Sequence, residues 1–218
     1  MNITYIVLVV IAGYLLGSIS TAVWAGKLFH GIDVREHGSG NAGATNTIRV
    51  LGWATGIPVM LVDVGKGWLA ASLPLFFHLA DKGSNTMISI QIIVGVAAIL
   101  GHLFPVFTGF RGGKGVGTTV GILLALHPLL TLSCLVVFLA MFLLTGIVSV
   151  SSMSFGLAFP VFLFTLFHTD SIVFKVFSIV IGIGLIITHR ENIGRIIRGE
   201  EKKLIRGKKK EPSADQPK

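Results

Sequence analysis

Three segments of this sequence carry the residue types that bind anions or move protons. The first, HGSGNAGATNTIR, runs from His37 to Arg49 and holds three glycines, two asparagines, a serine and two threonines. Such a backbone can turn sharply and point bare N–H groups at an anion, and a guanidinium adds a positive fork. An ordinary turn between helices is the alternative, but it needs fewer donors. The segment predicts an anion-binding loop, with these candidate substrate-binding residues: Gly38, Gly40, Asn41 and Arg49.

The second segment, GFRGGKGVGTT, covers residues 109–119 and combines five glycines with Arg111 and Lys114. A phosphate-binding P-loop would need glycine at position 108 and serine or threonine at 115, whereas the chain has Thr108 and Gly115. Glycine N–H groups and basic side chains at the start of a helix can still hold phosphate oxygens. We therefore expect a phosphate site without ATP chemistry, and a positive topology signal is the alternative. The candidate substrate-binding residues are Arg111, Gly112, Gly113, Lys114 and Gly115.

The third segment, HRENIGRIIRGEEKK, begins at His189. On a helix, His189 and Asn192 share one face because they are three residues apart. Histidine exchanges protons readily near neutral pH, although a histidine at a helix end is often only a cap. Serines 149, 151 and 152 interrupt an apolar stretch, and their hydroxyls either bind a polar headgroup or bond to carbonyls of the preceding turn.

The elements that position these segments must be membrane helices. Of the 218 residues, 52% are hydrophobic and 13% are charged, which disfavours a water-soluble domain and predicts an all-α polytopic membrane protein. Apolar runs of bilayer-spanning length cover residues 3–26, 55–80, 86–106 and 171–188. The stretch 116–168 holds either two long spans or three short ones, with breaks at His127-Pro128 and at Ser149–Ser152 in the second case.

The distribution of Lys and Arg favours three spans there, and seven in total. With the N-terminus outside, fifteen of the 18 Lys and Arg residues face the cytoplasm, and Lys82 and Lys175 lie outside. The C-terminus is then cytoplasmic, and all the polar segments lie on one membrane face. We expect one transmembrane domain over residues 1–206 and a disordered basic tail over 207–218. Within the second span, Asp63 and Lys66 are expected to form an ion pair, and contact with the substrate is the alternative.

Three motifs in order resemble the bacterial acyl-phosphate:glycerol-3-phosphate acyltransferase family: GSGNAGATNTIR, GHLFPVFTGFRGGKGV and HRENIGRIIRGEE. The resemblance extends from the first span to about Glu200. It implies a seven-helix protein of the bacterial cytoplasmic membrane whose active site faces the cytoplasm. It also implies transfer of a fatty acyl group from acyl phosphate to the 1-hydroxyl of glycerol 3-phosphate, which gives 1-acylglycerol 3-phosphate (lysophosphatidic acid) and phosphate in the first acylation step of phospholipid synthesis.

Carried over by position, the resemblance implies site roles for Ser39, Asn46, Arg49, Lys114, His189 and Asn192, with Ser152 as a weaker match. We expect Ser39, His189 and Asn192 to be catalytic, with Asn46 and Ser152 among the substrate-binding residues. His189 or the substrate's own phosphate would accept the hydroxyl proton, because no Asp/Glu–His pair is obvious. Ser39 as a covalent acyl carrier is the alternative to direct transfer. No histidine is followed five positions later by aspartate, so a thioester donor is disfavoured.

The expected partners are the two small-molecule substrates and the lipid bilayer, with no nucleic acid. No cofactor is expected, and no metal, since the histidines do not gather at ligand spacing. Whether the enzyme contacts a soluble enzyme that forms the acyl phosphate stays open, as does the oligomeric state. A transporter of anionic lipid-like solutes is the main alternative function, and it would require inverted repeats that the sequence does not display. A purely structural membrane subunit would leave the donor-rich loops unexplained.

Overall fold

The computed structural model describes residues 3–204, which form helices and turns with no β-strand among them. The predicted all-α class is therefore confirmed for this part of the chain, and the predicted tail 207–218 lies outside it. The helices, in order, are α1 Ile3–Gly17, α2 Thr21–His30, α3 Ala44–Leu51, α4 Trp53–Phe76, α5 Asn85–Leu103, α6 Val116–Leu126, α7 Pro128–Thr145, α8 Val148–Phe162, α9 Ile172–Thr188 and α10 Arg190–Ile197. Short 3-10 turns, η1 Val34–Glu36 and η2 Val106–Thr108, and a π turn, η3 Leu163–Phe167, complete the order.

Four segments between residues 3 and 204 are long and apolar enough to cross a membrane: α4, α5 extended to Thr108, α7, and α8 extended to Phe167. Two further candidates are bent pairs, with 42° between α1 and α2 and 55° between α9 and α10. Helix α6 has only 11 residues, which cover roughly 17 Å, or about half of the hydrocarbon thickness. A seventh full span therefore stays a prediction.

Two predicted boundaries differ from the structure. Residues 3–26 were expected to form one span, yet α1 ends at Gly17 and α2 begins at Thr21. The expected break at Ser149–Ser152 lies instead at Gly146 and Ile147, where Gly146 adopts φ 71° at the end of α7. The serines fit inside α8 because the hydroxyls of Ser151 and Ser152 donate to carbonyls four residues earlier. The predicted break at His127-Pro128 is present, with Pro128 as the first residue of α7.

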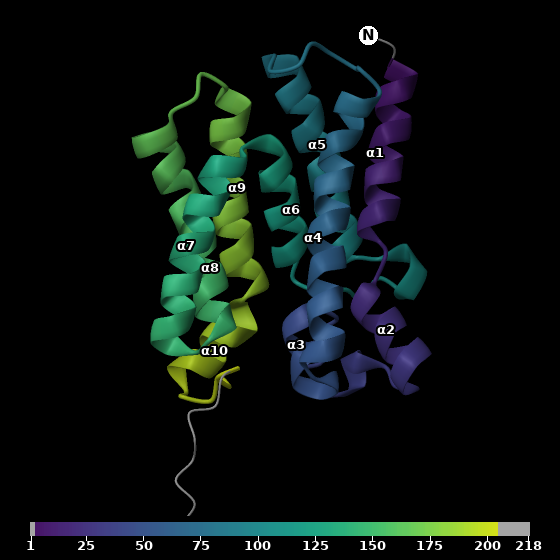
Figure 1. The fold of residues 1–218 in the computed structure, drawn as a ribbon, viewed down its shortest axis with the longest axis vertical. Helices are drawn as coiled ribbons and strands as arrows, with labels where there is room; N and C mark the ends of the chain where they lie inside the picture. Colours follow the sequence, from purple (N-terminus) through teal and green to yellow (C-terminus); the bar gives the residue numbers. More distant parts are fainter. Residues whose placement is uncertain (1–2, 205–218) are drawn as a thin grey trace, which may run out of the picture.

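Glycines allow the closest helix contacts. A Cβ on Gly17 of α1 would overlap the carbonyl of Ala98 in α5, and one on Gly121 of α6 would overlap the carbonyl of Val64 in α4. Figure 1 shows α7, α8 and α9 as one group and α1, α4 and α5 as another, with α6 between them. Helices α2, α3 and α10 lie at the end of the molecule opposite the first residues of α1 (Figure 1).

Candidate active site

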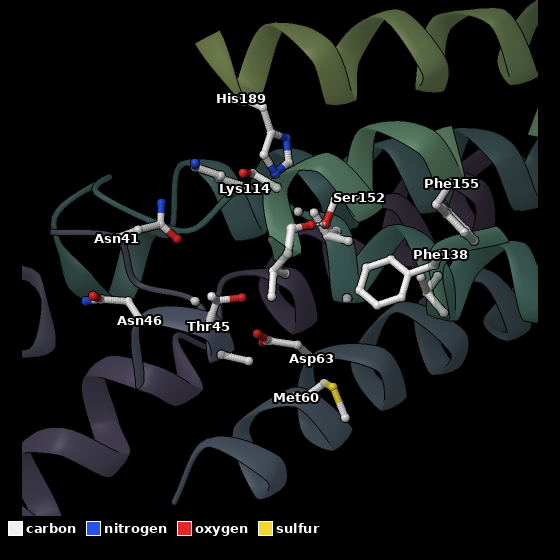
Figure 2. Close-up of a pocket in the computed structure, with 18 of the residues that line it drawn as sticks. Asn41, Thr45, Asn46, Met60, Asp63, Lys114, Phe138, Ser152, Phe155 and His189 are labelled. Atoms are coloured by element: carbon white, nitrogen blue, oxygen red, sulfur yellow. Dashed lines mark hydrogen bonds between the residues drawn. The ribbon is translucent and has the colours of Figure 1, made fainter. Parts of the chain in front are cut away.

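A cavity of about 380 Å³ lies where the two helix groups meet, and its lining changes from polar to apolar. In Figure 2, Asn41, Lys114 and His189 lie on one side and Phe138 and Phe155 on the other. The polar lining residues are Ser39, Asn41, Thr45, Asn46, Arg49, Asp63, His102, Lys114, Ser149, Ser152, His189, Asn192 and Glu201. The apolar lining residues are Ala44, Met60, Val64, Val116, Val120, Leu124, Leu135, Phe138, Val148 and Phe155. The cavity thus suits a molecule with an anionic head and a hydrocarbon tail.

The first motif forms a loop braced by Asn46, which is 2% exposed. Its Nδ2 donates to the carbonyls of Val34 (2.8 Å) and His37 (3.1 Å). Its Oδ1 accepts from the backbone N–H of Ser39 (2.8 Å) and from the Ser39 hydroxyl (3.1 Å). Gly38 has φ 64°, and a Cβ there would overlap Asn46 Oδ1. Asn46 therefore shapes the loop, and Ser39 stands exposed at its tip.

Arg49 lies in α3 and lines the cavity. One of its nitrogens, Nη2, donates to the carbonyl of Lys202 at 2.9 Å, while Nε is buried without a partner in the described residues. Burial, and then the neighbouring Arg195, lower the pKa of the Arg49 guanidinium, with Glu201 opposing them. An unpaired, partly desolvated guanidinium nitrogen is an available donor for an anion.

The second motif brings Lys114 to the third motif, because its ammonium donates to Oδ1 of Asn192. Lys114 is half-buried, and burial followed by repulsion from Arg195 lowers its pKa from 10.5 to about 8. Gly115 precedes α6 with φ 79°, and Gly115, Val116 and Gly117 line the cavity together with Lys114. The first N–H groups of a helix have no partner within it and suit an anion. Lys114 and the start of α6 therefore offer two kinds of positive partner to a phosphate.

The neighbouring glycines have a different use in the structure. The N–H groups of Gly112 and Gly113 donate to the carbonyls of Leu103 (3.1 Å) and His102 (3.2 Å). A Cβ on Gly112 would overlap the His102 carbonyl, and one on Gly113 would overlap the His102 ring. Among the predicted site residues, Gly38, Arg111, Gly112 and Gly113 do not line the cavity. Gly40 lines a smaller adjoining cavity of about 170 Å³, together with Ser39, Asn41, Lys114, Glu191 and Arg195.

The third motif is organised by Glu201. Its carboxylate accepts from Asn192 Nδ2 (2.6 Å), Ser149 Oγ (2.9 Å) and Arg195 Nε (2.7 Å). Burial alone would raise the pKa of Glu201, but these hydrogen bonds outweigh it and the pKa lies below its usual value. Since Asn192 Nδ2 is directed at Glu201, its Oδ1 is directed at Lys114. Glu201 therefore orients the amide that contacts Lys114.

His189 lies between α9 and α10 and is 3% exposed. Its Nδ1 is 2.7 Å from the carbonyl of Leu185, so Nδ1 carries the hydrogen and a neutral ring has its lone pair on Nε2. Ser152 also lines the cavity, but its hydroxyl donates to the carbonyl of Val148 at 2.9 Å.

Asp63, Lys66 and His102 form a buried ionic group, of which Asp63 and His102 line the cavity. Lys66 Nζ is 2.8 Å from Asp63 Oδ1, as the sequence predicts, and donates to the carbonyl of Ile19 at 2.7 Å in the break between α1 and α2. His102 Nδ1 is 3.7 Å from the same Asp63 oxygen. The structure thus contains a His–Asp contact that the spacing in the sequence does not reveal. Lys66 already neutralises that carboxylate, and no group of three potential metal ligands occurs in residues 3–204.

Thr45, His102 and Glu201 line the cavity but were not predicted as site residues. Thr45 could have been found, because it lies four residues before Arg49 and therefore on the same face of α3. Glu201 gave no such signal, since its partners are 52, 9 and 6 residues away and meet only in the folded chain.

A family model described as glycerol-3-phosphate acyltransferase matches residues 7–199. The chain belongs to this family. It is 40% identical over 232 residues to the glycerol-3-phosphate acyltransferase of Chlorobaculum tepidum, with 95% of this chain and 99% of the relative covered. It is 44% identical over 199 residues to glycerol-3-phosphate acyltransferase 2 of Bacillus anthracis, with 91% of this chain and 99% of the relative covered.

Two solved structures show the same fold. Both are crystal structures of PlsY (YgiH), described as an integral membrane glycerol 3-phosphate acyltransferase. The glycerol 3-phosphate form has a TM-score of 0.82 and 37% identity, and the lysophosphatidic acid form has 0.79 and 36%. Each comparison covers 91% of this chain and 95% of the other. The predicted family and the membrane-integral fold are confirmed.

Proposed function

We propose that this chain transfers a fatty acyl group from acyl phosphate to the 1-hydroxyl of glycerol 3-phosphate. The products are 1-acylglycerol 3-phosphate and inorganic phosphate. The observation that carries this proposal is the cavity's division into a cationic end around Lys114 and Arg49 and an apolar end around Phe138 and Phe155. Both substrates carry a phosphate, and only one of them carries a long hydrocarbon chain, so a site of mixed character is what the reaction needs.

The cationic end has enough donors for two phosphates. Lys114 and the first N–H groups of α6 suit the phosphate that leaves, because they can stabilise the charge that develops on it. Arg49, Ser39 and Asn192 suit glycerol 3-phosphate, since all three line the cavity with polar or charged side chains. The apolar residues of α6, Val116, Val120 and Leu124, repeat every four positions and form one wall for the acyl chain.

The chemistry needs alignment more than a strong base. The 1-hydroxyl oxygen attacks the acyl carbon, a new C–O ester bond forms, and the bond from that carbon to the phosphate oxygen breaks. Inorganic phosphate leaves with the bonding electrons, and the hydroxyl proton passes to Nε2 of His189 or to a phosphate oxygen. An acyl phosphate is a mixed anhydride with a good leaving group, so positioning and charge neutralisation supply much of the acceleration.

The remaining expectations belong to the same proposal. The enzyme works in the bacterial cytoplasmic membrane with the site on the cytoplasmic side. The helices α2, α3 and α10 lie at one end of the molecule (Figure 1) and carry Lys27, Arg49, Arg190 and Arg195, and such basic residues favour the cytoplasmic side. Direct transfer is favoured over an acyl-Ser39 intermediate, because the Ser39 hydroxyl contacts Asn46 Oδ1 (3.1 Å) and no base is among its contacts in the described residues. An acyl-enzyme that is trapped in the native protein and lost in Ser39→Ala would reverse that preference.

The deciding experiment uses protein purified in detergent. Given acyl phosphate and glycerol 3-phosphate together, it should release phosphate and form lysophosphatidic acid in equal amounts, detected by a phosphate assay and mass spectrometry. Acyl-coenzyme A and acyl carrier protein thioesters should not replace acyl phosphate. Lys114→Gln should lose most activity, whereas Lys27→Gln, which removes an exposed positive charge outside the cavity, should keep it. A transporter would release no phosphate, and activity with a thioester would refute the proposed donor.

A further inference from the structure

The short turn η1 directly precedes the first motif and contacts the loops of both the first and the second motif. We propose that Arg35 is a positioning residue that holds the 105–114 segment in the shape that places Lys114 in the cavity. This inference rests on the proposed function in one respect, because it takes Lys114 to be the phosphate-binding lysine. Arg35 precedes the motifs used to recognise the family, and it does not line the cavity.

The guanidinium of Arg35 is held in place by the carboxylate of Asp33. Nε is 3.0 Å from Asp33 Oδ1 and Nη2 is 2.7 Å from Oδ2, a two-point pairing that holds the planar group in one orientation. Both side chains are largely buried, at 14% and 10% exposed. The hydrogen bonds from Arg35 keep the pKa of Asp33 well below its usual value. The pair therefore stays charged and rigid throughout the physiological pH range.

The remaining guanidinium nitrogen, Nη1, bridges the second loop. It donates to the carbonyl of Thr108 at 2.7 Å and to the carbonyl of Arg111 at 3.1 Å. Between these two carbonyls lie Gly109 with φ 71° and Phe110 with φ 58°. A left-handed conformation is unfavourable for phenylalanine, and the Phe110 side chain is 58% exposed, so packing does little to hold it. Arg35 therefore holds both ends of a strained turn that leads, three residues later, to Lys114.

The same turn also supports the first motif. The carbonyl of Val34 accepts from Asn46 Nδ2 at 2.8 Å, and Asn46 in turn fixes the backbone of Ser39. Val34 itself is fully buried. Residues 33–35 thus fix the position of Ser39 through Asn46, and that of Lys114 through the second loop. A shift of this turn therefore changes the distance between Ser39 and Lys114.

Lys27 provides a matched control. Its ammonium is 3.3 Å from Asp33 Oδ2, and its side chain is 57% exposed. Lys27→Gln removes one positive charge from the same carboxylate as Arg35→Gln does, but it leaves the two carbonyl contacts intact. Arg35→Lys keeps the charge near Asp33 but cannot reproduce the planar fork that reaches the carboxylate and both carbonyls together.

The test measures kcat and KM for glycerol 3-phosphate and for acyl phosphate in detergent-purified variants, together with thermal unfolding. Arg35→Gln and Arg35→Lys should each lower kcat/KM roughly tenfold or more, the loss of about one charge-assisted hydrogen bond. Lys27→Gln should match the native enzyme. Because Lys114 is partly desolvated in its present place, loosening the segment should also move the alkaline limb of kcat/KM from pH about 8 towards higher pH.

A double-mutant cycle separates positioning from general stability. If Arg35 acts through Lys114, then Arg35→Gln should have little further effect on kcat/KM in the Lys114→Gln background, measured with radiolabelled glycerol 3-phosphate. Equal losses in both backgrounds, or an unmoved alkaline limb, would overturn the inference. If Arg35→Gln does not fold, Arg35→Lys decides the matter by the same measurements. Absence of activity in the native protein would instead refute the proposed function before any variant is compared.

Discussion

At the residue scale, the site depends on side chains that hold one another. Glu201 accepts from Asn192, and Asn192 accepts from Lys114, so an acidic group outside the predicted set orients two predicted ones. Glu201 also offsets part of the positive charge that Lys114, Arg49 and Arg195 place around the proposed phosphate site. An arriving phosphate would meet cations whose positions are already set, which reduces the reorganisation needed on binding.

Lys114 should determine the alkaline limit of activity. Its pKa is lowered to about 8, chiefly by burial, so the ammonium is charged below that pH and neutral above it. We expect kcat/KM to fall roughly tenfold per pH unit above pH about 8, since that parameter reports ionisations of the free enzyme. Lys114→Arg, whose guanidinium does not deprotonate in this range, should lose the alkaline limb even if its maximal rate is lower. An unchanged limb in that variant would assign it to another group.

His189 should contribute through its free nitrogen. With Nδ1 held by the carbonyl of Leu185, Nε2 is the available proton acceptor. His189→Gln should lower kcat by about 10²-fold to 10⁴-fold, the usual contribution of a general base, and should change the pH–rate profile. A variant that keeps the normal rate and profile would leave the substrate phosphate as the proton acceptor.

At the scale of elements, the position of α6 depends on one glycine of α4, Gly67. A Cβ on Gly67 would overlap the carbonyl of Thr118 in α6, whereas Gly65, two residues earlier in α4, has open space around the corresponding position. Since α6 carries both the N–H groups near Lys114 and a wall of the apolar end, its distance from α4 sets the width of the cavity.

This contrast predicts opposite effects for the same substitution. Gly67→Ala should reduce the free energy of unfolding by about 1–3 kcal/mol through overpacking and should lower activity as α6 moves. Gly65→Ala should be neutral or raise it by up to about 1 kcal/mol, because alanine favours a helix interior. Unfolding followed in detergent for both variants tests this, and equal effects would mean that α4 and α6 are less closely packed than described.

At the scale of the whole molecule, the chain separates a membrane-embedded frame from a polar end. The segments around residues 38–49, 111–115, 146–149 and 189–204 are joined there by long-range hydrogen bonds, including Leu204 N–H to the carbonyl of Gly146 at 2.9 Å and Arg49 to the carbonyl of Lys202. The α4–α5 connection lies at the opposite end (Figure 1). This arrangement supports the proposal of a single anion-binding site on one membrane face.

The proposed orientation can be measured with single-cysteine variants in a Cys134→Ser background. Lys82→Cys, in the α4–α5 connection, should react with an impermeant maleimide in intact cells, because it faces outside. Glu36→Cys, in η1, should react only after the membrane is opened. Labelling of both positions from the same side would contradict the proposed topology.

The sequence by itself determined the helical membrane class, the three motifs and the identities of most polar cavity residues, because apolar run length and residue type are local properties. It did not reveal the bend after Gly17 or the incorporation of Ser149–Ser152 into α8, since caps and hydroxyl-to-carbonyl bonds decide those boundaries. Boundaries in apolar sequence carry little periodic signal when most faces are hydrophobic.

Only the tertiary structure decided which of these residues meet. The contact of Lys114 with Asn192 spans 78 positions, and that of Arg35 with the carbonyl of Thr108 spans 73. Both depend on how several helices pack at once. Gly112 and Gly113 illustrate the limit of local interpretation, because a glycine-rich basic segment suggests anion binding. In the fold, their N–H groups donate to carbonyls of α5 instead. The absence of a Cβ at both positions leaves room for His102. A glycine's freedom is visible in sequence, but its use depends on which neighbour the fold brings against it.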